Sequence, residues 1–370
     1  MTKKAGQQLL LDYYQSIYSN RDAWCYFSKF DNPIGENVIE AFESAEKFIK
    51  EYLNAGNKAG LLVEFSKFKL DKLRWQHTLS AYLGGILIQK ELHIDIRRGI
   101  PQLEKHKVIK NFLYFWAMIC LTHDFAHSIE SESKNSEKNN LLWECSSIPS
   151  FAKKFEIEHN FIEACQSEDR DLYEKYYNYR ITYGENDEEN NKNIKKCIDH
   201  GIAGALIIYN ALIKLGNQPR EESSYTFSKE YKKHVFFIAN TIAKHNLWRA
   251  CKDNKLSYKK RKMYSLIPTD TDDKRIYLDK KEENLLFLLG LIDTIEPIKM
   301  FKKIDVMKQL EFGFKYETQN SKIDRTIEIK SIDLPRTVEY GNAIQEAETW
   351  LGVKVESIKE GYSGKKICFL

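Results

Sequence analysis

The chain has 370 residues, of which 42% are hydrophobic and 30% charged, a composition that is typical of a folded globular protein and excludes a disordered one. Its 57 basic residues nearly cancel its 53 acidic ones, so the net charge of +4 does not indicate a nucleic-acid-binding surface. The seven cysteines include no close CxxC pair, which indicates reduced thiols and excludes a cysteine zinc site.

The first part of the chain predicts support helices without chemistry of their own. Residues 1–68 carry apolar side chains at helical spacing in two segments, the second of which follows Pro33 and Gly35. The N-terminus lacks an apolar core of signal-peptide length, and no window approaches about 18 consecutive apolar residues. We therefore expect a cytoplasmic protein that neither spans nor binds a membrane.

Two helices follow that we expect to form the centre of the protein. The first runs from about residue 69 to 92 and contains His77. Its Gly84-Gly85 pair costs roughly 1 kcal/mol per glycine relative to alanine, which predicts close approach of another backbone. The second is an almost unbroken apolar run, residues 111–128, which predicts a buried helix that contains His123-Asp124 near its end.

The polar end of this second helix has two interpretations. A buried imidazole beside a carboxylate is costly unless the two groups hydrogen-bond or bind a cation. On a helix, His123 and His127 would share one face, whereas Asp124 would be turned by roughly 100°. A His–Asp hydrogen bond and a divalent metal site both remain open for the dipeptide alone.

The middle of the chain alternates helices with polar segments. Residues 128–140 predict a solvated loop, either an insertion or a lid, and residues 185–193 predict a second polar insertion. Helices are expected over 148–179, from Asp199-His200 onward, over 228–247, and in the apolar segment that contains Asp293. The basic run 258–262 fits either a solvated surface or a phosphate-binding one.

After residue 303 the hydrophobic period changes from 3.6 to 2. Residues 310–317 and 325–332 alternate like a pair of strands, a helix is expected over about 338–350, and two more strands follow. The sequence therefore predicts a mainly α protein in which residues 304–370 form a small α+β appendage.

A short set of polar residues lies within otherwise apolar helices. Each one alone could be a buried residue whose hydrogen bonds are made within the core. Together, however, they occupy five helices and offer the nitrogen and oxygen ligands that divalent ions prefer. The set consists of His77, His123, Asp124, His127, His200, His245 and Asp293. His234, beside two lysines at a helix start, is expected to be exposed.

The order of these residues resembles the HD superfamily of metal-dependent phosphohydrolases. The matching segments are RWQHTLSAYL, LTHDFAHS, DHGIAGALII, IANTIAKHNLW and LLFLLGLIDTIEP, which span about residues 69–300. The resemblance implies an HD helical bundle over 69–303 that binds one or two divalent ions (Mn, Mg, Fe, Ni or Co). It implies a first metal held by His77, His123, Asp124 and Asp293, and a second held by His200 and His245, with Asp124 bridging the two.

Two departures from the usual pattern bear on the substrate. Where alarmone and cyclic-dinucleotide hydrolases usually carry a lysine, this chain has His127. A histidine at this position resembles the pattern of deoxynucleoside triphosphate hydrolases and cyclic-nucleotide phosphodiesterases. In those proteins such a histidine is a candidate proton donor. Where many binuclear members have two adjacent histidines, this chain has His245-Asn246, which leaves the second ion open.

We therefore expect a phosphohydrolase that acts on a cyclic nucleotide or a (deoxy)nucleoside triphosphate, with His127 and Asp124 as catalytic residues. Arg74, Lys244 and Arg249 could clamp a phosphate or could simply be solvated charges. Two alternatives are a nuclease on single-stranded nucleic acid, which the lack of a basic and aromatic groove disfavours, and a nucleotide-sensing scaffold without turnover. A homo-oligomer, paired through a strand edge of the appendage, also remains open.

Overall fold

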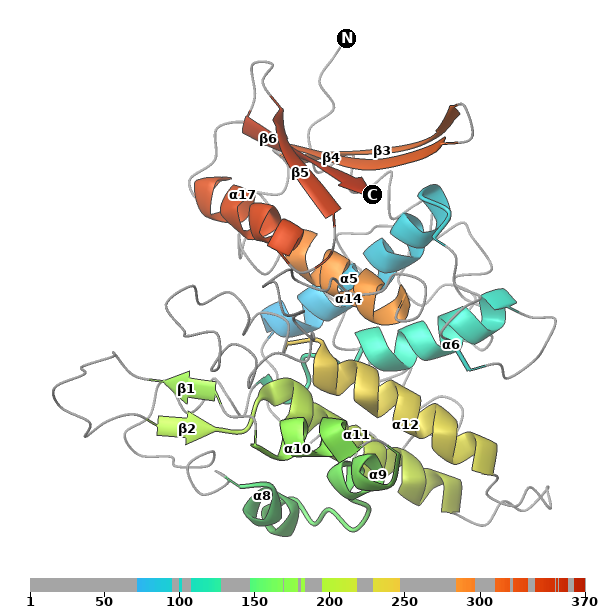
Figure 1. Ribbon diagram of the computed structural model, residues 1–370, viewed down its shortest axis with the longest axis vertical. Helices are drawn as coiled ribbons and strands as arrows, with labels where there is room; N and C mark the ends of the chain where they lie inside the picture. The colour runs from blue at the N-terminus through green and yellow to red at the C-terminus, as the bar shows by residue number, and fades with distance from the viewer. Residues whose placement is uncertain are drawn as a thin grey trace, which may run out of the picture. The chain divides into compact units, whose positions relative to one another are not determined.

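The computed structural model describes residues 72–94, 100–101, 108–127, 147–168, 170–178, 181–183, 195–217, 229–246, 284–296, 310–319, 322–331, 337–349, 351, 353–358 and 363–369 (Figure 1). The described part is mainly α-helical and ends in a four-stranded sheet, which confirms the predicted mainly α chain with C-terminal strands. The expected N-terminal support helices, the polar segments 128–140 and 185–193, and the basic run 258–262 lie outside these residues.

The chain divides into two compact units whose segments alternate along the sequence. The described elements of the first unit lie within residues 72–120 and 267–370, and those of the second within 121–266. The boundaries expected at residues 68 and 303 stay predictions. None of the described helices combines the length and apolar character that crossing a membrane requires.

The first unit joins three buried helices to the C-terminal sheet. Its elements are α5 (Lys72–Glu91), α6 (Val108–Cys120), α14 (Asn284–Ile295), β3 (Leu310–Gln319), β4 (Lys322–Ser331), α17 (Thr337–Glu346), the 3-10 helix η4 (Ala347–Thr349), β5 (Val353–Ile358) and β6 (Ser363–Phe369). All twelve residues of α14 are buried. This helix packs against α5 and α17, as its apolar sequence requires.

Gly85 of α5 makes room for an aromatic ring. A Cβ on Gly85 would overlap the indole ring of Trp116 in α6. The indole Nε1 of Trp116 also donates a 2.8 Å hydrogen bond to the Tyr82 carbonyl. At Gly85 a side chain, the Trp116 indole, occupies the space that the glycine leaves, whereas the expected approach of another backbone stays a prediction at Gly84.

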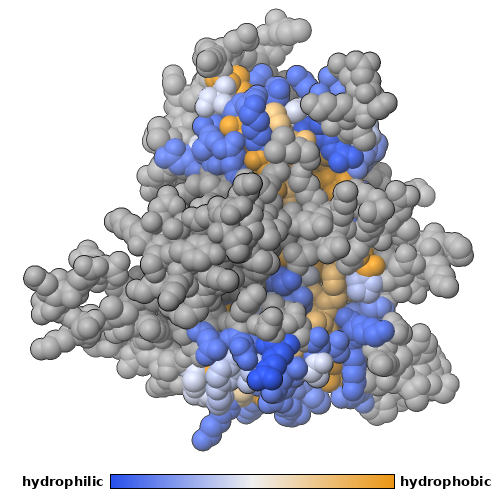
Figure 2. Space-filling view, in the orientation of Figure 1, coloured by the Kyte–Doolittle hydropathy of each residue, from blue (hydrophilic) through white to orange (hydrophobic). Residues whose placement is uncertain are grey.

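The C-terminal sheet has the antiparallel order β3-β4-β6-β5, and α17 packs on one face of it (Figure 1). Buried Ile327, Ile367 and Val355 lie in register across three strands and form the inner face. The other face pairs charges, such as Lys315 with Glu328 at 3.3 Å. Among the coloured residues in the upper part of Figure 2, most are hydrophilic. The period-2 pattern predicted these strands, whereas their order comes from the structure.

The second unit is built on helices α11 and α12, which pack against each other and against α9. Its elements are α8 (Ile148–Lys154), α9 (Phe161–Glu168), α10 (Arg170–Asn178), β1 (Ile181–Tyr183), β2 (Lys195–Cys197), α11 (His200–Asn217) and α12 (Lys229–Lys244). His234 in α12 is buried, so the expectation that it is exposed was wrong. Val235, Ile238 and Ile242 of the same helix are also buried.

The apolar run ends its helix earlier than predicted. Phe112, Phe115, Trp116 and Ile119 are buried as expected, but α6 stops at Cys120. Residues 121–126 form consecutive turns, in which Phe125 N–H donates to the Thr122 carbonyl. His123 and Asp124 therefore lie after the helix, and the helical-face separation expected for them does not apply.

Candidate metal centre

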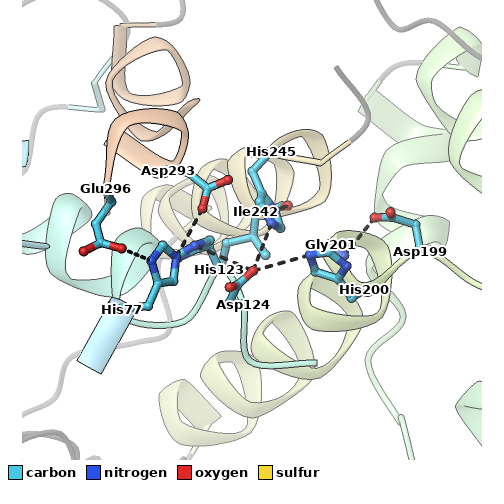
Figure 3. A network of polar contacts seen from close by, with 10 residues as sticks. All are labelled: His77, His123, Asp124, Asp199, His200, Gly201, Ile242, His245, Asp293 and Glu296. Carbon is cyan, nitrogen blue, oxygen red and sulfur yellow. Dashed lines mark hydrogen bonds and ion pairs between the residues drawn. The ribbon is translucent and has the colours of Figure 1, made fainter. Parts of the chain in front are cut away.

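His77 lies between two carboxylates in the first unit. Its Nε2 is 3.1 Å from Oδ1 of Asp293, and its Nδ1 is 2.8 Å from Oε2 of Glu296 (Figure 3). Helix α5 carries the imidazole, the last turn of α14 carries Asp293, and Glu296 directly follows that helix. All three residues are buried.

The two contacts of His77 have unequal chemical roles. A neutral imidazole that donates through Nδ1 to Glu296 has an acceptor lone pair at Nε2. Oδ1 of Asp293 is also an acceptor. Two acceptors, Nε2 of His77 and Oδ1 of Asp293, attract each other only if a cation or a second proton lies between them. A carboxylate that orients a histidine through its far nitrogen is the usual arrangement behind a metal-binding imidazole.

Tyr340 connects the appendage to this carboxylate pair. Its hydroxyl, carried by α17, donates to the carbonyl of Ile295, the residue that precedes Glu296. Burial raises the pKa of Tyr340 well above its ordinary value, and the charge of Glu296 raises it further. The phenol therefore remains a neutral donor beside Glu296.

Asp124 lies among three imidazoles in the second unit. Its Oδ1 is 3.4 Å from Nε2 of His200, 3.7 Å from Nε2 of His123 and 3.8 Å from Nε2 of His245. All four residues are buried, and Figure 3 shows the three rings gathered around one carboxylate. The turns after α6, the start of α11 and the end of α12 supply them.

The spacing of these atoms fits a metal ion. The distances exceed the roughly 2.7–3.2 Å of a hydrogen bond. Ligand atoms that lie roughly 2.1 Å from one ion in a tetrahedral site are about 3.4 Å apart. Ligand atoms of Asp124, His200 and His245 all lie within 4.8 Å of one another, so this buried His/Asp cluster could hold a metal ion.

The local structure of α12 orients His245 for this purpose. Its Nδ1 lies 2.6 Å from the Ile242 carbonyl, one turn back, and donates to it, so that the lone pair is on Nε2, the atom that faces Asp124. Burial, together with the neighbouring His200 and His123, lowers the pKa of His245 to about 4, although Asp124 acts in the opposite direction. The ring is therefore neutral at neutral pH, as a metal ligand must be.

The remaining predicted site residues have separate outcomes. The ring of His127 lies 5.1 Å from that of His200, beside the cluster, and His127 is partly exposed. Lys244 is partly exposed in the last turn of α12, directly before His245. Arg74 belongs to α5, but its side chain lies outside the described part of the structure, and so does the whole of Arg249.

Three residues of the site were not predicted from the sequence. Glu296 could have been found, because it stands one turn after Asp293 and faces the same side of a helix that is otherwise apolar. Asp199 accepts hydrogen bonds from backbone N–H groups of Gly201 and Ile202 and caps α11. Asn246 donates to Asp199, a contact that no sequence pattern indicates.

The chain was compared with protein-family models, curated proteins and solved structures, and none of the three comparisons gave a match.

Proposed function

We propose that the chain is a divalent-metal-dependent phosphohydrolase of the HD type that cleaves a phosphoester or phosphoanhydride bond of a nucleotide. One observation carries the proposal: Oδ1 of buried Asp124 lies 3.4–3.8 Å from three imidazole nitrogens. Burying such a carboxylate is costly without a counter-charge. The imidazoles are neutral ligands when unprotonated, so a metal ion is the counter-charge that fits the donor set.

We further propose that each of the two sets of residues binds a divalent ion. His77 and Asp293 would hold one ion, and Asp124 would hold another together with His200 and His245, beside His123. The pairing of His77 with Asp293 and of Asp124 with His200 and His245 supports this division. It also keeps the residue order through which the sequence resembles the HD superfamily.

Each residue then has a defined task. A bound divalent ion supplies a water molecule of lowered pKa and neutralises charge on phosphoryl oxygens. His127, beside His200, donates a proton to the leaving oxygen as the bond to phosphorus breaks. Lys244, with Arg74 and Arg249, binds the phosphate groups. His127 in place of the lysine that alarmone hydrolases carry favours cyclic nucleotides and (deoxy)nucleoside triphosphates as substrates.

The experiment that tests the proposal combines metal analysis with a substrate screen. Metal-free protein is reloaded with Mn²⁺, Co²⁺ or Mg²⁺ and incubated with cyclic nucleotides and with (deoxy)nucleoside triphosphates, and the products are separated by ion-exchange chromatography. We expect turnover that His123→Ala and Asp124→Asn each reduce at least about 100-fold. His159→Ala, which removes a histidine outside both sets, is the matched control and retains full turnover.

Three other results would point elsewhere. Tight nucleotide binding by metal-loaded protein without turnover would indicate a sensing scaffold. Cleavage of single-stranded nucleic acid in place of nucleotides would indicate a nuclease. Folded protein that binds none of these ions would refute the metal-dependent mechanism.

A further inference from the structure

One hydrogen bond joins the chain next to His200 to the chain next to His245. Asp199 directly precedes His200, and Asn246 directly follows His245. The side-chain Nδ2 of Asn246 donates to Oδ2 of Asp199. The start of α11 is thereby tied to the end of α12, at the point where each presents an imidazole to Asp124.

The Asp199 carboxylate is held firmly enough to serve as an anchor. It is fully buried, and its Oδ1 accepts from the backbone N–H groups of Gly201, at 2.8 Å, and Ile202, at 3.3 Å. With Asn246 on Oδ2, both oxygens are hydrogen-bonded, which is the condition for burying a carboxylate without a large penalty. The same bonds cap the first turn of α11.

Gly201 brings the two helices into contact at the same place. A Cβ at this position would lie 2.9 Å from the carbonyl oxygen of Ile242, so only glycine allows this approach. That carbonyl also accepts from Nδ1 of His245. The orientation of the His245 ring and the docking of the α11 start therefore depend on one backbone oxygen.

We propose that Asp199 and Asn246 are positioning residues that set the spacing of the His200 and His245 imidazoles around Asp124. The inference rests on the metal-dependent function proposed above. Nε2 of His200 and Nε2 of His245 lie 3.4 and 3.8 Å from the same carboxylate oxygen. A shift of either helix end would change these distances directly. Asn246 thus acts outside the ligand set, through Asp199.

The test exchanges the two side chains in the full-length protein. Asn246→Asp places two carboxylates against each other, and we expect it to weaken Co²⁺ binding about 10- to 100-fold by calorimetry. The double variant Asp199→Asn, Asn246→Asp restores a donor–acceptor pair with reversed direction and keeps an acceptor for the Gly201 N–H. We expect it to recover Co²⁺ affinity to within about threefold of wild type.

Asn217→Asp is the matched control, because it adds the same charge to an exposed residue at the far end of α11, about 26 Å along the helix. It is expected to bind Co²⁺ like wild type. Unchanged Co²⁺ affinity in folded Asn246→Asp would overturn the proposal. If Asn246→Asp does not fold, the double variant decides: wild-type affinity supports positioning, and weak binding or failure to fold overturns it.

A readout without metal separates this inference from the proposed function. In EDTA, the side-chain nitrogen and proton shifts of His245 report its tautomer by nuclear magnetic resonance. We expect the Nδ1–H tautomer in wild type, a mixture in Asn246→Asp and the Nδ1–H tautomer again in the double variant. An unchanged tautomer in Asn246→Asp would overturn the positioning role. Wild-type protein with this tautomer pattern but no Co²⁺ binding would refute only the hydrolase.

Discussion

The lowered pKa of His245 makes the stability of the metal-free protein depend on pH in a way that one substitution can isolate. In the folded chain, burial lowers the pKa of this imidazole to about 4. In the unfolded chain it titrates near its ordinary value of about 6.5. Between these two values the unfolded state binds more protons, so the free energy of unfolding falls as the pH is lowered from 6.5 towards 4.

The magnitude follows from the two pKa values. At pH 7 the ring is neutral in both states and its titration contributes almost nothing. At pH 5 the unfolded ring is almost fully protonated and the folded one is not, which lowers the free energy of unfolding by about 2 kcal/mol. His245→Gln removes this contribution, because glutamine does not titrate.

The assay is urea denaturation in EDTA at pH 7 and pH 5, for wild type and His245→Gln. The variant is expected to be less stable than wild type at pH 7, since it loses the hydrogen bond to the Ile242 carbonyl. When the pH is lowered from 7 to 5, its free energy of unfolding is expected to fall by about 2 kcal/mol less than that of wild type. His159→Gln, which removes a histidine outside both sets, is the control. Equal losses in wild type and His245→Gln would refute the reasoning.

Three further predictions concern packing and orientation. Gly85→Ala should lower the free energy of unfolding by about 2–4 kcal/mol in urea titrations, because displacing Trp116 outweighs the roughly 1 kcal/mol gained in helix propensity. Gly204→Ala, whose Cβ would meet nothing closer than 3.5 Å, should be neutral or slightly stabilising, and equal effects would contradict this. Glu296→Gln should weaken Mn²⁺ binding about 10- to 100-fold by calorimetry, whereas unchanged affinity would deny that Glu296 orients His77. Tyr340→Phe should cost about 1–2 kcal/mol of stability in urea titrations, and no loss would mean that its hydroxyl bond is not formed in solution.

The sequence predicted the elements whose signal is local. The period-2 alternation after residue 303 predicted strands within a few residues of β3 and β4, because one face of the sheet is buried and the other is charged. The pairing of His77 with Asp293 and the gathering of His200 and His245 at Asp124 also agree with the residue chemistry. Polar side chains in apolar helices must be satisfied within the protein, which limits where they can lie.

Features that depend on tertiary contacts escaped prediction. Helical periodicity continues through His123 and Asp124, so nothing local indicates that α6 ends at Cys120 and gives way to turns. Similarly, a glycine at position 85 indicates that there is no room for a Cβ. It does not indicate that the Trp116 indole fills the space. The partnership of Asp199 with Asn246 joins residues 47 apart in sequence, and no periodicity encodes it.

Charge balance explains why the two sets of site residues differ in what they require. His77 faces two carboxylates, so a neutral imidazole leaves two buried negative charges to be compensated. Asp124 contributes one negative charge, and the neutral His245 ring beside it stabilises that charge only weakly until a cation is present. The carboxylates of Asp293 and Glu296 therefore create the stronger demand for positive charge, whereas the imidazoles around Asp124 supply the ligand atoms.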